Sequence, residues 1–560
     1  MNFRKSLYQV SLVTIMAISA VNTQAQGVVP AQKGDKTFTL EDLNFGGNNY
    51  RNMVAKNRWC TWWGDQLVRQ DVDACYLVNK TNGKETKLFG INDINQWIAP
   101  TKDVKVRALY NARFPFAGKS IVMVSNGSKT YTVDFRKHRL ISELEFQEGE
   151  NLLEANTQQN AFAYLKGSNL YVRTFNAAPE NAMTKEKKSH DFQLSADGSR
   201  EIVYGQSVHR DEFGISKGTF WSPNGERLAF YRMDQSMVTD YPQVNIPEIG
   251  FDHPETQSCI ATPAPDKYPM AGETSHQVTV GVFDCLTGKT IYLKAGDPTD
   301  RYFTNIAWSP DSKTVYMFEV NRDQNDSRLT AYDAETGEKT GELYRETDEK
   351  YVEPLHPIMF LPWDSNRFIM QSRKDGYNHL YLCTLGKHGS RMASNTESLD
   401  IRQLTSGKWE VMEVLGFNRK RKSIIIASNE CSPIQRNIFL VDTQTGKRTM
   451  MDDCGKGWHN ATLSESGQFV YDNYSTPDVP RKIAIVNTEN GKRTAYFTAE
   501  NPWKGYNVPE YSCGTVKAAD GETDLYWRMV KPTNFDPAKK YPTIIYVYGG
   551  PHAHNVDARW

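Results

Sequence analysis

The chain has 560 residues, with 66 Lys and Arg against 66 Asp and Glu, and 12% of its residues are aromatic. This length is too great for one compact core and predicts two or more domains. The zero net charge argues against a nucleic-acid partner, which would require a basic face. Basic runs such as 419–422 lack an aromatic platform and are typical of solvated turns.

Residues 1–25 have the pattern of a secretory signal peptide. Arg4 and Lys5 precede an apolar stretch from Leu7 to Val21, and the small residue Ala25 follows. A membrane anchor is the alternative, but polar residues interrupt the stretch, and it falls short of the roughly 20 residues of a spanning helix. We therefore expect cleavage after Ala25, export to the periplasm, cell surface or medium, and no membrane span in the mature chain.

The eight cysteines are widely spread, without a C-x-x-C motif or a histidine pair at zinc spacing. We therefore expect neither a metal site nor a cofactor. In an exported protein some cysteines can pair, and Cys431 with Cys454 or Cys259 with Cys285 are the nearest candidates. Free buried thiols are an equally open alternative, because connectivity does not follow from sequence.

A repeated pattern fills the region from about Arg51 to Glu500. A β-rich segment ends in Asp or Asn, and a short polar stretch then leads to Gly and another β-rich segment. The glycine supplies the positive φ of a tight hairpin, and the Asp or Asn side chain caps the turn. The copies are 76–83, 282–288, 331–337, 440–446 and 485–491.

A second repeated element consists of Trp, Ser and Pro followed by a turn and a strand. It occurs at Trp221–Gly225 and at Trp308–Ser312. A tryptophan buried between adjacent sheets is typical of propeller blades. At roughly 50 residues per repeat, residues 51–500 predict an all-β propeller of about eight blades, with no competing helical periodicity.

A second domain is predicted after Pro502. Asp520 and Gly521 favour a hairpin turn, and residues 525–530 favour a strand. Residues 543–548 form another apolar, β-rich run between Pro542 and Gly549, which predicts a buried strand. Such a strand needs neighbours for its backbone groups, so we expect 501–560 to be the first part of a larger domain and the chain to be a fragment.

The end of the chain resembles the entry to the α/β-hydrolase domain of prolyl oligopeptidase-type serine peptidases, in Phe535–Pro537, Lys540–Pro542 and Val547–Pro551. His209–Phe213 before Trp221, together with Gly376–Leu380 and Leu404–Val411, is similar to the dipeptidyl peptidase IV group. The resemblance covers nearly the whole mature chain. It implies an all-β propeller of about eight blades followed by the first part of an α/β-hydrolase domain, with residues 26–50 packing on the hydrolase part.

The resemblance also implies site residues. In that group two carboxylates in the propeller hold the free α-ammonium of the peptide, and they correspond to Asp211 and Glu212. An ammonium has three donors, so two carboxylates match its charge and its hydrogen bonds. The group usually has Glu at the first position, so Asp211 is one methylene shorter. An isolated Asp-Glu pair would otherwise be read as two solvated loop acids.

Tyr548 matches the family tyrosine whose hydroxyl donates to the oxyanion, whereas Tyr546 is expected to be a core residue. A phenol can stabilise developing negative charge without ionising at neutral pH. The family arginine that holds the substrate carbonyl has no clear counterpart between Ala117 and Arg139.

The catalytic serine, acid and base are expected to be absent from this chain. The G-x-S-x-G sequence at Gly214–Gly218 runs into the propeller strand at Thr219, whereas a nucleophile elbow needs a buried hydrolase strand before it and a helix after it. His552 and His554 follow Tyr548 and are expected to have positioning roles.

These features predict an exported serine exopeptidase that releases N-terminal dipeptides with Pro or Ala at the second position. The chain as given is expected to be inactive alone. Its partners would be peptides with a free N-terminus and, in the complete enzyme, a second copy in a homodimer. The alternative is a non-catalytic propeller that binds peptides or proteins.

Overall fold

The computed structural model describes residues 25–98, 105–127, 129–175, 189–246, 260–386, 399–452, 455–550 and 552–560. The predicted signal peptide therefore lies outside the described residues, apart from Ala25. The described residues form two compact units, one within 1–93, 107–119 and 409–560 and the other within 94–106 and 120–408.

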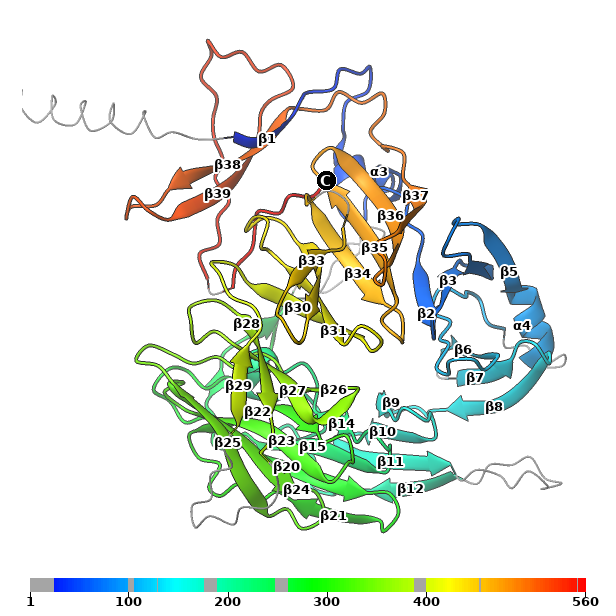
Figure 1. The fold of residues 1–560 in the computed structure, drawn as a ribbon, viewed down its shortest axis with the longest axis vertical. Coiled ribbons are helices and arrows are strands. Elements are labelled where there is room, and N and C mark those ends of the chain that lie inside the picture. The colour runs from blue at the N-terminus through cyan, green and yellow to red at the C-terminus, as the bar shows by residue number, and fades with distance from the viewer. Residues whose placement is uncertain are drawn as a thin grey trace, which may run out of the picture. The chain divides into compact units, whose positions relative to one another are not determined.

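Three four-stranded antiparallel sheets form most of the first unit, each with its strands in chain order (Figure 1). Their strands are β2 (Cys60–Trp63), β3 (Gln66–Gln70), β4 (Ala74–Val78) and β5 (Glu85–Gly90); β30 (Val411–Asn418), β31 (Ser423–Ser428), β32 (Asn437–Asp442) and β33 (Arg448–Met450); and β34 (Trp458–Leu463), β35 (Phe469–Thr476), β36 (Val479–Asn487) and β37 (Arg493–Thr498).

Within this unit the first sheet of the chain packs against the last. Leu67 of β3 shares a buried apolar cluster with Tyr471 of β35 and Ile483 of β36. The Trp62 indole donates to Thr462 Oγ1 at 3.1 Å, so a polar contact accompanies the apolar one. The sheet β30–β33 packs against β34–β37 through a second cluster that includes Ile425 and Val470. Three sheets from opposite ends of the sequence thus share continuous apolar cores.

The N-terminal segment pairs with the region that follows the last sheet. The strand β1 (Ala25–Val29) runs antiparallel to β38 (Tyr511–Lys517), which forms a hairpin with β39 (Asp524–Val530). Phe38 stacks on Tyr506 with ring centroids 4.8 Å apart. Two short helices, α2 (Leu40–Leu43) and α3 (Tyr50–Met53), follow β1.

The expected strand at 543–548 is not formed, which corrects the sequence prediction. Residues 541–549 carry no strand assignment, and Ile544 is 96% exposed. Among the described residues no neighbouring strand pairs with this segment. An apolar, β-rich run forms a strand only when a partner satisfies its backbone groups, so here it stays extended and solvated.

Besides two two-stranded sheets, the second unit contains five larger antiparallel sheets in chain succession (Figure 1). Their strands are β6 (Ile121–Asn126), β7 (Lys129–Asp134) and β8 (Arg139–Glu145); β9 (Glu150–Ala155), β10 (Ala161–Lys166), β11 (Asn169–Phe175) and β12 (Ser189–Gln193); β13 (Ile202–Tyr204), β14 (Thr219–Trp221), β15 (Arg227–Asp234), β20 (Gln277–Asp284) and β21 (Lys289–Tyr292); β22 (Arg301–Trp308), β23 (Thr314–Asn321), β24 (Asp326–Asp333) and β25 (Lys339–Thr347); and β26 (Met359–Leu361), β27 (Asp364–Ser372), β28 (His379–Thr384) and β29 (Asp400–Gln403).

The repeated tryptophans join neighbouring sheets of this unit, as expected. The Trp221 indole donates to the carbonyl of Glu154 in β9 at 3.4 Å, and the Trp308 indole donates to that of Phe220 in β14 at 3.0 Å. A large buried cluster beneath Trp308 includes Tyr231 of β15 and Met317 of β23. Each tryptophan therefore fills the space between two sheets and ties their edges together.

The hairpin turns follow the predicted chemistry. Gly288 has φ +69° and Gly337 has φ +75°. The Asp333 carboxylate accepts hydrogen bonds from the backbone amides of Glu335 and Thr336 at 3.0 and 2.8 Å. The equivalent glycines of the other three copies, Gly83, Gly446 and Gly491, also have positive φ.

One helix interrupts a region expected to be all-β. The helix α4 (Ile91–Ile98) buries Ile94 and Ile98, and the amide of Gly90 donates to Asp93 at 2.6 Å at its start. Apolar residues at Ile91, Ile94 and Ile98 follow a helical spacing over two turns. That run is too short to stand out against the strand repeat.

The described part of the chain thus holds eight successive antiparallel sheets of three to five strands, beside three further small sheets, consistent with an N-terminal propeller. Among the described residues there is no helix long and apolar enough to cross a membrane. Cys75, Cys383 and Cys513 are buried free thiols. Cys259 and Cys454, which complete the two candidate disulfides, lie outside the described residues.

Candidate functional site

Asp211 and Glu212 lie on a strained turn, η2 (His209–Gly214), in the second unit. His209, Arg210, Asp211 and Phe213 have φ of 52°, 55°, 65° and 56°, whereas Glu212 alone is extended. A non-glycine residue in the left-handed region is uncommon, and each one costs about 1–3 kcal/mol. Four such residues within five consecutive positions persist only where surrounding contacts enforce them, and such strain is concentrated at functional sites.

Contacts on its buried side hold this turn. Phe213 is 3% exposed and packs edge-on against Tyr302, with ring centroids 5.0 Å apart. Gly214 has φ +71°, and a Cβ at this position would lie 2.5 Å from the carbonyl oxygen of Leu355. The side chain of Ser207 donates to the Asp211 carboxylate. The Glu212 side chain remains exposed above a fixed backbone, where it lines a cavity.

Glu212 lines a cavity of about 1020 Å³ within the second unit. His209 and Arg210 of the turn line it as well, together with segments that contain Tyr268, His276 and Arg322. The Arg322 guanidinium donates to Ser275 Oγ and to the Tyr302 hydroxyl, both at 2.7 Å. Among the described residues it forms no ion pair with a carboxylate. The cavity therefore offers a glutamate on one wall and a guanidinium held by two hydroxyls on another.

The surroundings of Glu212 disfavour its charge. Partial burial raises the pKa of Glu212, the like charge of Glu353 raises it further, and the positive charge of Arg322 lowers it. The charged form of such a carboxylate is stabilised when a cation approaches. A ligand ammonium would relieve the repulsion between Glu212 and Glu353.

Two buried histidines form part of the cavity wall. His209 and His276 are each 2% exposed, and their ring centroids lie 6.1 Å apart. Both ring nitrogens of His209 and Nδ1 of His276 lack a hydrogen-bond partner among the described residues. Burial lowers the pKa of His209 to about 3 and that of His276 to about 4. Both rings are therefore neutral at physiological pH, and each has polar atoms free for a ligand.

The other predicted site residues lie in the first unit. Tyr548 is 64% exposed and Tyr546 is 84% exposed, so the expected core position of Tyr546 is wrong for the structure described here. Both tyrosines belong to the segment that lacks a partner strand. His554 Nε2 lies 2.7 Å from Asp557 Oδ1, and its ring packs near Trp458.

The G-x-S-x-G sequence has the environment expected of a propeller turn. Ser216 is exposed and is followed by β14 rather than by a helix. A Cβ at Gly218 would overlap the backbone of Gln206, with 2.0 Å to the carbonyl oxygen. This local structure differs from the strand–turn–helix arrangement of a nucleophile elbow.

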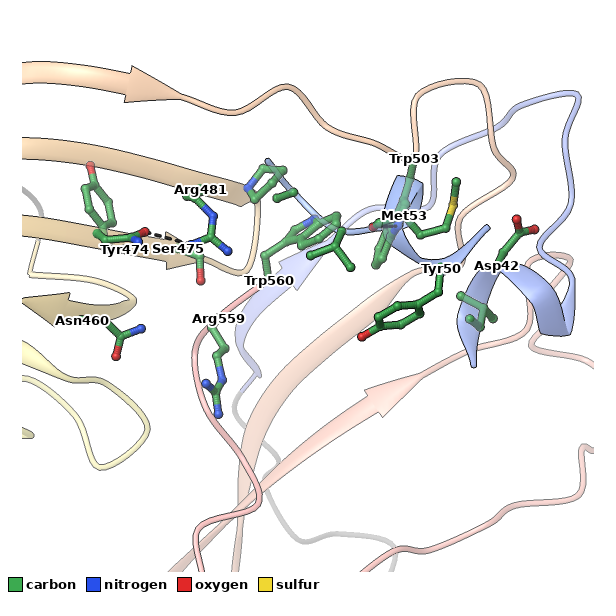
Figure 2. A pocket seen from close by; sticks show the side chains of 15 residues that line it. Asp42, Tyr50, Met53, Asn460, Tyr474, Ser475, Arg481, Trp503, Arg559 and Trp560 are labelled. Atoms are coloured by element: carbon green, nitrogen blue, oxygen red, sulfur yellow. Dashed lines mark hydrogen bonds between the residues drawn. The ribbon is translucent and has the colours of Figure 1, made fainter. Parts of the chain in front are cut away.

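A second, smaller cavity of about 370 Å³ lies in the first unit (Figure 2). Trp503 and Trp560 pack against each other in its wall with ring centroids 4.2 Å apart and ring planes tilted by 34°, and the Trp503 indole donates to the carbonyl of Met53 at 3.1 Å. Arg481 projects from the strand side of the same cavity (Figure 2), and burial lowers its pKa. No group of three potential metal ligands occurs among the described residues of either unit.

Comparison with known proteins identifies the larger part of the chain. A family model for the dipeptidyl peptidase IV N-terminal region matches residues 117–481, more than half of the sequence. The chain belongs to the dipeptidyl peptidase IV family. The matched range contains the acid turn and the whole wall of the larger cavity.

Solved and curated relatives of this dipeptidyl peptidase IV-like chain agree with that assignment. A Bacteroides ovatus protein assigned as a dipeptidyl aminopeptidase IV is 44% identical with a TM-score of 0.82, and the match covers 94% of this chain and 71% of that one. Porphyromonas gingivalis dipeptidyl peptidase 4 shares the fold at 20% identity and a TM-score of 0.69, with the same coverage. The protein named "probable dipeptidyl-aminopeptidase B" of Emericella nidulans is 25% identical over 536 residues, 86% of this chain and 56% of that protein. The chain thus spans about half the length of the curated relatives that it matches.

Sequence reasoning missed several residues of the cavity. Arg322, Tyr302 and His276 carry no local motif, and Glu353 reaches the acid turn only through the fold. No short-range pattern in the sequence marks any of these four residues.

Proposed function

We propose that this chain is the substrate-recognition part of an exported serine exopeptidase that releases N-terminal dipeptides with Pro or Ala at the second position. The observation that carries the proposal is the strained acid turn, which presents Glu212 to a cavity that also contains Arg322. Family membership supports the same reaction class. The serine, acid and base of the reaction would lie beyond Trp560.

Asp211 and Glu212 would hold the peptide's α-ammonium. Its three N–H groups match two acceptor carboxylates, and each charge-assisted bond is worth about 1.5–3 kcal/mol. The raised pKa of Glu212 supports this role, because an ammonium removes the penalty that burial and Glu353 impose. When the first nitrogen of the substrate is held in one place, the serine can reach only one peptide bond of that substrate. Cleavage of the bond after the second residue releases a dipeptide.

Tyr548 would donate a hydrogen bond to the oxyanion that forms when the serine attacks the scissile carbonyl. Tyr548 is exposed here, and a donor of this kind, once it is held in place in the complete domain, would contribute about 2.7–4 kcal/mol to catalysis. The acyl-enzyme formed by serine attack would then be hydrolysed by water.

The remaining features of the proposal concern the whole enzyme. The packing of the first sheet on the last supports a closed propeller of eight blades. The signal-like residues 1–25 support export. A homodimer of the complete enzyme is also proposed, and light scattering of that enzyme would test it.

Extending the protein through its own reading frame beyond codon 560 tests the proposal. The extended protein should hydrolyse Gly-Pro chromogenic substrates and lose this activity to a serine-directed phosphonate. The 560-residue chain should do neither. A stop directly after codon 560, or phosphonate-sensitive turnover by the chain alone, would contradict the proposal and favour a binding propeller or another active site.

A further inference from the structure

One side-chain amide joins the acid turn to a second acidic segment. Asn305 lies in β22 at a point where the pairing register shifts, with φ 55°. Its Nδ2 donates to the carbonyl of Phe213 at 3.2 Å and also to the carbonyl of Pro354. Phe213 directly follows Glu212, and Pro354 directly follows Glu353. A single amide therefore fixes the backbones of two glutamates relative to each other.

Apolar packing supports the same junction. Phe213 and Val352 belong to one buried cluster, with Val352 3% exposed. Gly214 approaches the carbonyl of Leu355 so closely that no side chain fits between them. The residues before and after Glu353 thus contact the residues after Glu212. Asn305 is itself 9% exposed, so its amide has no competing access to bulk water.

We propose that Glu353 is a third acid next to the ammonium site, held near Glu212 by Asn305, and that its charge sets the pH range over which Glu212 binds an ammonium. This inference rests on the proposed function. Glu353 acts here as a positioning and tuning residue, because it works through Glu212.

The other charges that face Glu212 favour this assignment. Arg210 is paired with Asp266, and the guanidinium of Arg322 is held by two hydroxyls, so the positive charge of Arg322 acts on Glu212 from across the cavity that both residues line. His209 and His276 are neutral. Asp300, Asp323 and Glu273 add further negative charge along the cavity wall. The local excess of carboxylates matches a cationic ligand.

A second observation points to a ligand in this cavity independently of the acids. His209 is 2% exposed, lines the cavity and has both ring nitrogens without a partner among the described residues. Buried polar atoms are nearly always satisfied, by protein, water or ligand. The peptide backbone behind the ammonium has the donors and acceptors that a neutral imidazole requires.

The test is the pH dependence of Gly-Pro-amide binding to the 560-residue chain, followed by calorimetry or ligand-observed NMR. Parent affinity should fall as the pH drops and Glu212 becomes protonated. Glu353→Gln removes the like charge, so the midpoint of this fall should move down by about half a pH unit or more. Glu349→Gln makes the same charge change four residues away on the same segment and should leave the midpoint in place.

Asn305→Leu keeps the side-chain size and removes both hydrogen bonds. It should weaken binding about 5-fold or more, and in its background Glu353→Gln should no longer move the midpoint. Thermal unfolding of each variant separates loss of fold from loss of binding. If Asn305→Leu fails to fold, the comparison of Glu353→Gln with Glu349→Gln decides alone.

Different results would contradict the proposed function and the role of Glu353. If Glu212→Gln binds Gly-Pro-amide as well as the parent, the proposed function is wrong. If Glu212→Gln abolishes binding but Glu353→Gln leaves the midpoint within 0.2 pH units of the parent, about the precision of such a titration, only the role of Glu353 is overturned.

Discussion

Arg210 donates to the carboxylate of Asp266, and its guanidinium carbon lies 4.3 Å from the centre of the Tyr268 ring. Arg210 is the neighbour of Asp211 on the strained turn. Asp266 belongs to a short hairpin of β16 (Asp240–Tyr241) and β19 (Asp266–Lys267), beside a second one of β17 (Val244–Asn245) and β18 (Thr262–Pro263). The acid turn is therefore anchored from outside by a hairpin as well as from beneath by Phe213.

Replacing Arg210 by Met should release this outer anchor. An exposed ion pair and a cation–π contact are together worth about 1–2 kcal/mol. We expect Kd for a free-amine dipeptide amide to rise about 3- to 10-fold, and the loss to shrink at high salt. Calorimetric titration of the variant measures it.

Arg200→Met is the matched control, because Arg200 holds the same hairpin through Asp240 and the carbonyl of Pro265 but lies outside the acid turn. An equal loss in both variants would show that the hairpin as a whole matters and not its contact with the turn.

Gly214→Ala should disrupt the turn from its inner side. The new methyl would meet the Leu355 carbonyl at 2.5 Å in a backbone with φ +71°. We expect a loss of stability of about 1–3 kcal/mol and at least a 10-fold loss of peptide affinity. Gly376 also has a positive φ, +93°, but a Cβ there would have no atom within 4 Å. Gly376→Ala therefore has the cost of a left-handed backbone for alanine without a steric clash. Peptide affinity should be unchanged in that control. Urea unfolding measures the stability of both variants, and peptide titration measures their affinity.

Much of the fold was accessible from the sequence because its signals are local. Asp333 caps its own turn and Gly337 supplies a positive φ four residues later, so the repeat could be read from neighbouring residues alone. Trp308 was predicted to join sheets because the turn and strand after it fix its place at a sheet edge. The helix α4 was missed because eight residues carry only a weak helical period.

The site was accessible only in part. Asp211 and Glu212 carry a recognisable motif, but their left-handed backbone depends on Phe213, Asn305 and Leu355, which are far apart in sequence. Arg322 directly follows β23 and reaches the cavity through the pairing of that strand, so no short-range sequence pattern predicts its position. Residues 543–548 were wrongly predicted as a strand, because strand formation requires a partner that a local sequence window does not reveal.

Buried His209 should make the fold sensitive to acid. Its pKa is lowered to about 3 in the folded chain, so below its unfolded value of about 6.5 the unfolded chain binds a proton that the folded chain does not. Stability should therefore be full above about pH 6.5 and fall by up to about 1.4 kcal/mol per pH unit as the pH drops. His209→Phe should flatten this dependence between about pH 6.5 and 5.

Thermal melts over this range measure the slope for the parent and the variant. His190→Phe changes an exposed histidine that packs on Phe192 with ring centroids 4.2 Å apart, and it should leave the slope unchanged. Equal slopes in the parent and in His209→Phe would contradict the buried neutral state of His209.

Tyr548→Phe separates an oxyanion role from a structural one. In the enzyme extended beyond Trp560, the loss of a transition-state donor should lower kcat about 10²–10³-fold and leave KM within about threefold. Tyr546→Phe, two residues away on the same segment, should leave kcat almost unchanged. Steady-state kinetics on a Gly-Pro substrate test both, and similar effects at the two positions would count against the assignment of Tyr548.

The most direct test of the account is Glu212→Gln in the extended enzyme, because it keeps the side-chain shape and removes one charge. Loss of one charge-assisted hydrogen bond should lower kcat/KM for a free-amine dipeptide substrate about 10- to 150-fold. Replacing Asp211 as well should cost more but not additively, since both acids share one ligand. An N-acetylated substrate should have a low kcat/KM with the parent, and neither change should alter that value. A kcat/KM for Glu212→Gln within about twofold of the parent would contradict the account.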